Sequence, residues 1–214
     1  AGAHFCTELR RIRTELKVAV EQGQNMSSQY SEALNVCIPM RSCLYFLPQI
    51  TQRFEAAMPH VALNIKFLYG EGRVDLFLRG EQDILFARES ELKRFSSVRT
   101  APLYDSHFYI VVCTDDPLAE RETLSADDLA GRTFMVGGGS PAEMVVVQNR
   151  IVGSGQVQIL NCPDHETAMA NVAARKGIVM SPGFANDHNG EFVWIPFDCS
   201  EHMKCVLGYH RDDV

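Results

Sequence analysis

The sequence lacks several features that mark other classes of protein. No Cys-x-x-Cys pair occurs among its 214 residues, and no signal segment of charged, apolar and small residues opens the chain. Its longer apolar runs, such as HFYIVVC (His107–Cys113), fall far short of the ~20 residues that a membrane-spanning helix needs. With 46% hydrophobic and 22% charged residues, the composition is that of a globular protein. We therefore expect a folded cytoplasmic protein with no membrane partner.

Positive charge is also scarce. The chain has 20 Lys and Arg residues against 27 Asp and Glu residues, which gives a net charge of -7 at pH 7. Affinity for nucleic acid comes mainly from clustered cations that contact phosphates. We therefore do not expect this chain to bind DNA or RNA by itself, and any basic DNA-binding part would lie elsewhere.

The cysteines form no pattern typical of a metal site or a disulfide framework. Seven are scattered at positions 6, 37, 43, 113, 162, 199 and 205. Such an odd, scattered set is typical of a reducing compartment, where Cys serves as a small buried hydrophobe, and Cys37 and Cys113 fall in apolar strand-like runs. The seven His residues supply no closely spaced ligand pair for zinc. We predict no metal and no cofactor.

The first 24 residues have the pattern of an amphipathic helix. Apolar residues recur at alternating steps of four and three, the spacing of a coiled-coil seam, at Phe5, Leu9, Ile12, Leu16 and Ala19. The polar stretch QGQNMSSQYS then separates this helix from the rest of the chain. The pattern favours a dimerising linker helix, and a surface helix of its own domain is the alternative.

After this stretch, apolar strands alternate with amphipathic helices in two successive rounds. The fold class is therefore α/β, with two doubly wound lobes of mixed, mostly parallel sheets. We place lobe I at 32–105 and 200–214 and lobe II at 106–199, with crossing segments at Tyr104, Asp105 and Ser106 and near 199–202. Such lobes would form a cleft lined by the loops that follow the first strands, PMRS and GGGSP.

Four segments resemble one known family in order within residues 33 to 211, and the N-terminal helix precedes them. The four are FLPQITQRFEAAMPHVALNI, LFLRGEQDILFA, HFYIVVCTDDPLAERETLSADDLAGRTFM and the later MANVAARKGIVMSP. They are similar to the effector-binding domain and linker helix of LysR-type transcriptional regulators. The resemblance implies a type 2 periplasmic-binding-protein-like fold, an inducer held between the lobes, and homodimers or tetramers. It also implies DNA binding through a winged helix-turn-helix that is not in this chain.

The loop after the first strand of lobe I carries two candidate effector contacts. Arg41 and Ser42 stand near the position where relatives have a small hydroxyl residue, and Gly70 stands where they often have another. A guanidinium beside free helix N–H groups favours an anion. The alternative for Arg41 is an ion pair with Asp83 or Glu81, and the alternative for Ser42 is a helix N-cap.

The other candidate contacts lie at the ends of later strands. Gly139 and Ser140 belong to GGGSP, which has no lysine for a phosphate loop and no full dinucleotide motif, so we expect no nucleotide cofactor. The alternative is a tight turn with positive φ that opens a helix with a Ser cap. Arg88 ends the third strand and points either into the cleft or to solvent. Next in the chain, the apolar run Met144–Val147 is interpreted as a subunit interface.

Function is predicted as sensing of a small anionic effector, not catalysis. His165 precedes a helix that Asp164 would cap, but no nucleophile is placed to use it as a base, so we expect a structural histidine. Two alternatives remain: a solute-binding protein of a transporter, and a cysteine redox sensor like one relative within the family. The effector, the target promoters and the sign of regulation are not specified by the sequence.

Overall fold

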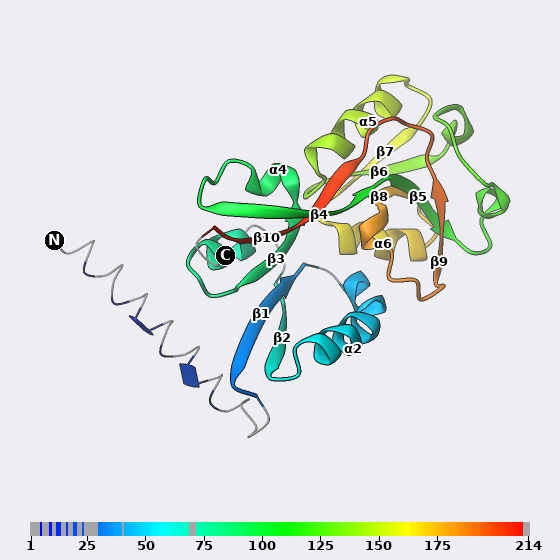
Figure 1. The fold of residues 1–214 in the computed structure, drawn as a ribbon. Helices are drawn as coiled ribbons and strands as arrows, with labels where there is room; N and C mark the ends of the chain where they lie inside the picture. Colours follow the sequence, from blue (N-terminus) through cyan, green and yellow to red (C-terminus); the bar gives the residue numbers. More distant parts are fainter. Residues whose placement is uncertain are drawn as a thin grey trace. The chain divides into compact units, whose positions relative to one another are not determined.

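A computed structural model gives the fold (Figure 1). It describes residues 30–39, 41–68 and 72–211, and in the N-terminal stretch eight single positions: Phe5, Leu9, Ile12, Arg13, Leu16, Ala19, Val20 and Gly23. Each of these eight residues is helical and exposed. The helix expected in this stretch is present at these positions, and its pairing with another chain stays a prediction.

The chain divides into two compact units. Unit 1 comprises residues 1–103 and 205–214, and unit 2 comprises residues 104–204. The strands β4 (Val98–Ser106) and β10 (Met203–His210) each run across this division. The predicted hinge, Tyr104–Ser106, is the end of β4; Ser106 is buried there and its hydroxyl accepts a hydrogen bond from the amide of Phe184 at 3.0 Å. A hinge role for these residues stays a prediction.

Unit 1 is built on a five-stranded mixed sheet in the order β2-β1-β3-β10-β4. Its first three strands are β1 (Glu32–Ile38), β2 (Val61–Phe67) and β3 (Ile84–Arg88). They run parallel, with Val36 opposite Ile65 and Ile84, whereas β10 pairs antiparallel with β3. The carboxyl ends of β1, β2 and β3 therefore meet at one edge of the sheet.

Helices α3 (Gly72–Leu78) and α4 (Glu89–Leu92) bury their apolar residues on this sheet. Phe77 and Leu92 join Cys37, Leu85 and other buried side chains in one cluster. By contrast α2 (Leu47–Ala57) has no buried residue. In a single copy of the chain, α2 thus leaves Ile50 exposed and Leu47 and Phe54 only half-buried.

The start of α2 differs from the prediction. Residues Arg41–Tyr45 form a 3-10 helix, η1, and α2 begins only at Leu47 with Phe46 as its N-cap. Ser42 therefore does not cap α2, and the expectation of a Ser42 cap is wrong. Pro48 stands in the first turn of α2, where its missing N–H costs no hydrogen bond.

Unit 2 repeats this architecture with strand order β7-β6-β8-β5-β9. The parallel strands are β6 (Thr133–Gly137), β7 (Gln158–Cys162) and β8 (Ile178–Pro182). The antiparallel strands are β5 (Phe108–Cys113) and β9 (Phe192–Pro196). Short 3-10 helices occupy Pro117–Glu120 (η2), Asp127–Leu129 (η3) and Gly183–Ala185 (η4). Two α/β units with mixed sheets confirm the predicted fold class.

The longer helices of unit 2, α5 (Ala142–Gly153) and α6 (His165–Ala173), lie on opposite faces of its sheet (Figure 1). Alternation along the strands explains this, since Phe134 packs in the cluster of α5 and the next residue, Met135, packs in the cluster of α6. In α5, Met144 and Val147 are buried and only Val146 of the run is clearly exposed. Met144 and Val147 are therefore core residues, and the interpretation of the run Met144–Val147 as an interface is wrong for these two residues.

No helix in the part of the chain that the structure describes is both long enough and apolar enough to cross a membrane.

Candidate functional site

The carboxyl edge of the unit 1 sheet collects the predicted lobe I contacts. The segments after β1 and β2 carry Arg41, Ser42 and Gly70, and Arg88 is the last residue of β3. The side chains of Arg41 and Ser42, and Gly70 as a whole, lie outside the described residues. The backbone of Arg41 starts a five-residue 3-10 helix and not α2, so the expected position of Arg41 in the first turn of the long helix is wrong, while its contact with an effector stays a prediction.

Arg88 is part of a cluster of two arginines on one carboxylate. Glu91 accepts a hydrogen bond from Arg73 Nη2 at 2.6 Å on each carboxylate oxygen, and Arg88 Nη2 lies 3.1 Å from its Oε1. The Arg88 amide also donates to Glu91 Oε2 at 2.9 Å, which caps α4. Arg73 and Glu91 are mostly buried, and the side chain of Arg88 keeps 27% of its surface exposed. The cluster carries one more positive than negative charge.

Electrostatics keep Glu91 ionised. Burial acts to raise its pKa, but the hydrogen bonds and charges of Arg88 and Arg73 outweigh burial and hold the pKa below the usual glutamate range. Nearby, burial raises the pKa of the Cys37 thiol to about 11, although the charge of Arg73 acts against the rise. Cys37 is thus a neutral core thiol, as predicted for a strand residue.

Arg73 and Glu91 are not among the site residues predicted from the sequence. A signal for Arg73 was available, because it stands four residues before the buried Phe77 and so lies on the apolar face of α3. Charged residues are rarely buried unless paired, so an arginine on such a face indicates a specific partner. The identity of that partner, 18 residues away in the chain, requires the fold.

The carboxyl edge of the unit 2 sheet carries the GGGSP loop. A side chain at Gly137 would place its Cβ 1.9 Å from the Cys162 carbonyl oxygen, and one at Gly138 would meet the Pro163 oxygen at 2.1 Å. Gly139 has φ +84° and open space beside it. The first two glycines are therefore required by the close approach of β6 to β7, and the third by its backbone conformation.

The end of this loop corrects another expectation. Pro141 is the N-cap of α5, with no side-chain cap, and half-buried Ser140 donates its amide to the Gly137 carbonyl at 3.4 Å. The predicted Ser140 cap is thus wrong, and the Ser140 hydroxyl does not cap α5. At the same edge, the fully buried hydroxyl of Ser181 in β8 has no hydrogen-bond partner among the described residues.

His165 begins α6, and the predicted cap is present. Asp164 accepts a hydrogen bond from the Thr167 amide at 2.7 Å. Burial lowers the pKa of His165, and the charges of Glu166 and Asp164 only partly oppose this, so the imidazole is neutral at pH 7. A half-buried neutral ring at a capped helix start is consistent with a structural histidine.

The described cysteines form no disulfide with one another. Burial, together with Glu201, raises the pKa of Cys199, as burial does for Cys37. A sensor thiol is activated by a lowered pKa and by exposure, so these two cysteines have the opposite character. Among the described residues no three of His, Cys, Asp and Glu are arranged to hold a metal.

One protein family matches most of the chain, including both units of the fold. The model of the LysR substrate binding domain matches residues 27–214. The chain belongs to this family. This LysR domain is 23% identical over 184 residues to the HTH-type transcriptional regulator MetR of Salmonella typhimurium, covering 80% of the chain and 57% of the relative. It thus spans a little over half the length of the curated relatives it matches.

Solved structures support the fold of the LysR domain. The crystal structure of CbnR, a LysR family transcriptional regulator, aligns with a TM-score of 0.71 at 16% identity, over 99% of this chain and 75% of that one. The BenM effector binding domain with its effector benzoate aligns with a TM-score of 0.63 at 17% identity, over 85% of each chain. The LysR domain therefore has the type 2 periplasmic-binding-protein-like fold predicted above.

Proposed function

We propose that this LysR domain senses a small anionic effector and that the sensing controls DNA binding by a winged helix-turn-helix outside the chain, in the cytoplasm. Family membership over residues 27–214 carries this proposal. The matched relatives are transcriptional regulators and not enzymes or transporters. The effector contacts proposed are the loops at the carboxyl edges of the two parallel strand sets, with Arg41, Ser42, Gly70 and Arg88 in one and Gly139 and Ser140 in the other.

The charge of the Arg73–Glu91–Arg88 cluster supports an anionic effector. Two guanidiniums contact one carboxylate near the end of β3, which concentrates positive charge at this edge of the sheet. Arg88 is the more exposed of the two cations, with 27% of its side chain accessible against 11% for Arg73. A planar guanidinium matches the geometry of a carboxylate or phosphate. Benzoate, the effector of the structurally similar BenM domain, is itself a carboxylate.

Replacing the proposed contact arginines is expected to weaken effector binding without unfolding the chain. A thermal-shift screen with carboxylates, sugar phosphates and aromatic acids would first identify a stabilising ligand. Arg88→Ala and Arg41→Ala should then each lower affinity for that ligand by roughly 10- to 100-fold, since a hydrogen bond to a charged group contributes about 1.5–3 kcal/mol. Calorimetric titration measures the change.

The control for this experiment is Arg99→Ala, which removes an exposed cation of β4 in the same unit. It should leave affinity within about twofold of the original, because an isolated surface charge is largely screened. Unchanged affinity in both Arg88→Ala and Arg41→Ala would remove these arginines from the effector site. A ligand that is turned over instead of bound at equilibrium would contradict the sensing role itself.

Homo-oligomerisation is the second part of the proposal. No residue of α2 is buried, and Tyr45, Phe46, Ile50 and Met58 at and around this helix are 42–59% exposed. The helical positions Phe5, Leu9, Ile12, Leu16 and Val20 are exposed as well. Groups of exposed apolar side chains such as these are typical of subunit interfaces. An effector would act by binding two quaternary states with different affinity.

Ile50→Asp is expected to reduce the mass of the oligomer. The change places a charge in the exposed apolar face of α2, where burial against a second subunit would require its desolvation. Light scattering coupled to size exclusion measures the mass. Gln52→Asp, on an exposed polar position of the same helix, is the matched control and should keep the original mass. If Ile50→Asp also keeps the original mass, α2 is not the interface.

A further inference from the structure

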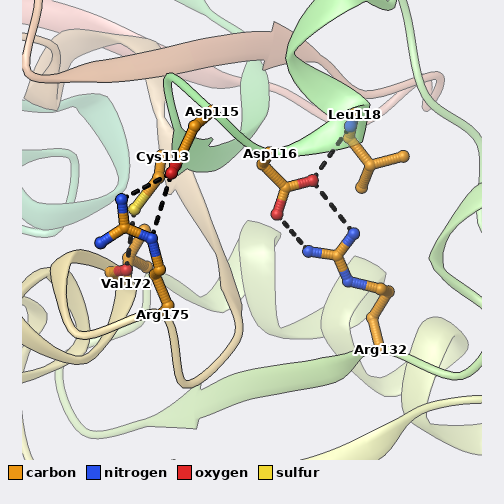
Figure 2. A network of polar contacts seen from close by, with 7 residues as sticks. All are labelled: Cys113, Asp115, Asp116, Leu118, Arg132, Val172 and Arg175. Carbon is orange, nitrogen blue, oxygen red and sulfur yellow. Dashed lines mark hydrogen bonds and ion pairs between the residues drawn. The ribbon is translucent and has the colours of Figure 1, made fainter.

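Unit 2 contains a pocket of about 460 Å³ at the edge of its sheet opposite the GGGSP loop. Its polar lining includes two arginines, a lysine and two aspartates: Arg132, Arg175, Lys176, Asp115 and Asp116. The remaining lining residues are Cys113, Pro117, Gly131, Thr133, Val172 and Gly177. Figure 2 shows the two arginines, each directed at one of the aspartates. The volume is within the range of small-molecule sites, roughly 300–1,000 Å³.

The position of the pocket in the sheet separates it from the GGGSP loop. Thr133 is the first residue of β6, and Gly177 directly precedes β8. Cys113 ends β5, which runs antiparallel to β8. The pocket therefore lies at the amino edge of the parallel strands, whereas GGGSP follows their carboxyl edge. A ligand here would occupy a different site from the proposed effector.

One wall of the pocket is a fixed ion pair. Arg132 contacts both carboxylate oxygens of Asp116, with Nη1 to Oδ1 at 3.1 Å, and Asp116 also accepts the Leu118 amide at 2.9 Å as the cap of η2. Burial acts to raise the pKa of Asp116, but these hydrogen bonds and the charge of Arg132 outweigh it and lower the pKa. The half-buried pair is therefore ionised and held in place (Figure 2).

The opposite wall has cations that a ligand can reach. Arg175 donates to Asp115 Oδ2 from Nη2 at 2.5 Å and from Nε at 3.2 Å, and both side chains are more than half exposed. Exposed ion pairs contribute little to stability, so an anion can replace Asp115 on Arg175 at small cost. Lys176, the next residue, forms no ion pair with any described residue and is exposed.

The acceptors at this end of α6 are already used. The Val172 carbonyl accepts the Arg175 amide at 2.8 Å and the Cys113 thiol at 3.0 Å, and the Asn171 carbonyl accepts the Lys176 amide at 3.0 Å. Three cationic side chains thus face two carboxylates, which leaves one positive charge in a chain whose net charge is -7. Among the lining residues, Lys176 is therefore a cation that has no ion-pair partner in the described part of the chain.

We infer that this pocket is a second ligand site, which binds a small metabolite through a carboxylate or phosphate group held by Lys176 and Arg175. The volume has room for an organic acid and not only an inorganic ion. The inference does not rest on the proposed effector, because none of the lining residues belongs to the effector loops.

The test uses the full chain labelled with ¹⁵N and titrated with succinate and, separately, with inorganic phosphate at constant ionic strength set by chloride. We expect saturable shifts of the amide signals of Gly131–Thr133 and Arg175–Gly177. Lys176→Gln and Arg175→Gly should each weaken binding by roughly tenfold or more, as expected for loss of a charged hydrogen-bond donor. Arg175 has φ 57°, a conformation that glycine adopts readily, so Arg175→Gly removes the guanidinium without backbone strain.

Arg121→Gln is the matched control, because Arg121 is an exposed cation of the same unit that pairs with Asp128 outside the pocket. It should leave both titrations unchanged. Tighter binding of succinate than of phosphate would identify carboxylates as the ligand class, and the reverse would identify phosphates. Absence of saturable shifts, or equal weakening by Arg121→Gln, would overturn the site. The effector screen is unaffected by that result, since Arg88 and Arg41 report on the other site.

Discussion

Gly138→Ala is expected to lower the free energy of unfolding by about 3 kcal/mol, the upper end of the usual range for overpacking. A Cβ at residue 138 would lie 2.1 Å from the Pro163 carbonyl oxygen and 3.1 Å from its carbon. Both are backbone atoms just after β7, and the Gly138 amide bonds to the neighbouring Cys162 carbonyl at 3.0 Å. Relief of the clash would require the ends of β6 and β7 to separate, with loss of that hydrogen bond.

Denaturant unfolding followed by circular dichroism measures this change. Gly153→Ala is the matched control, because it introduces the same methyl group at the last residue of α5, where no atom lies within 4 Å. Alanine is the better helix former, so this variant should gain about 0.5–1 kcal/mol. If both variants have the same stability, the close approach at Gly138 does not constrain the loop.

Much of the fold could be predicted because apolar periodicity directly reflects burial. NVCIPM reads as a strand since Cys37 and Ile38 are core residues, and HETAMANVA reads as a helix since Ala168 and Val172 face the sheet four residues apart. The local hydrogen bonds at helix starts were harder to predict. A 3-10 turn at Arg41–Tyr45 and a proline cap at Pro141 depend on the backbone path and not on the apolar pattern.

The candidate sites were only partly predictable, because the apolar pattern locates strand ends but not the contacts between distant segments. Arg88 could be found because it ends a parallel strand, and strand ends are positions that sequence locates. Glycine in GGGSP suggested close approach to a ligand, whereas Gly137 and Gly138 approach the backbone of residues 162–163. The pocket of unit 2 is lined by four segments between Cys113 and Gly177, which only the folded sheet brings together.

Glu91→Gln is expected to lower the free energy of unfolding by about 2–4 kcal/mol. Removing one partner of a buried ion pair costs about 3–5 kcal/mol, and the partial exposure of Arg88 reduces this figure. Glutamine can still accept the Arg88 amide, so the cap of α4 is retained and the loss reports on charge. Glu81→Gln is the control, because Glu81 pairs with the 61% exposed Arg79 and should cost less than about 1 kcal/mol.

The pH dependence of this difference follows from the lowered pKa of Glu91 in the folded state. A carboxylate with a depressed folded pKa contributes stability above its unfolded pKa, about 4.3 for Glu, and loses that contribution as the pH falls through the folded value. The original protein and Glu91→Gln should therefore differ fully at pH 7 and converge below about pH 4. A difference that is constant from pH 7 to pH 3 would show that Glu91 acts through packing and not through its charge.

The same variant links stability to the proposed function. Without the charge of Glu91, the two guanidiniums lose the carboxylate that they share, so a bound anion would compensate more charge than in the original protein. A ligand that binds only the folded state stabilises it by about 2.7 kcal/mol at a hundredfold excess over its Kd. Sulfate, compared with chloride at equal ionic strength, should therefore raise the melting temperature of Glu91→Gln more than that of the original protein or Glu81→Gln. Equal effects of sulfate on all three would mean that anions do not reach the Arg73 and Arg88 pair, and the charge argument for an anionic effector would lose its structural support.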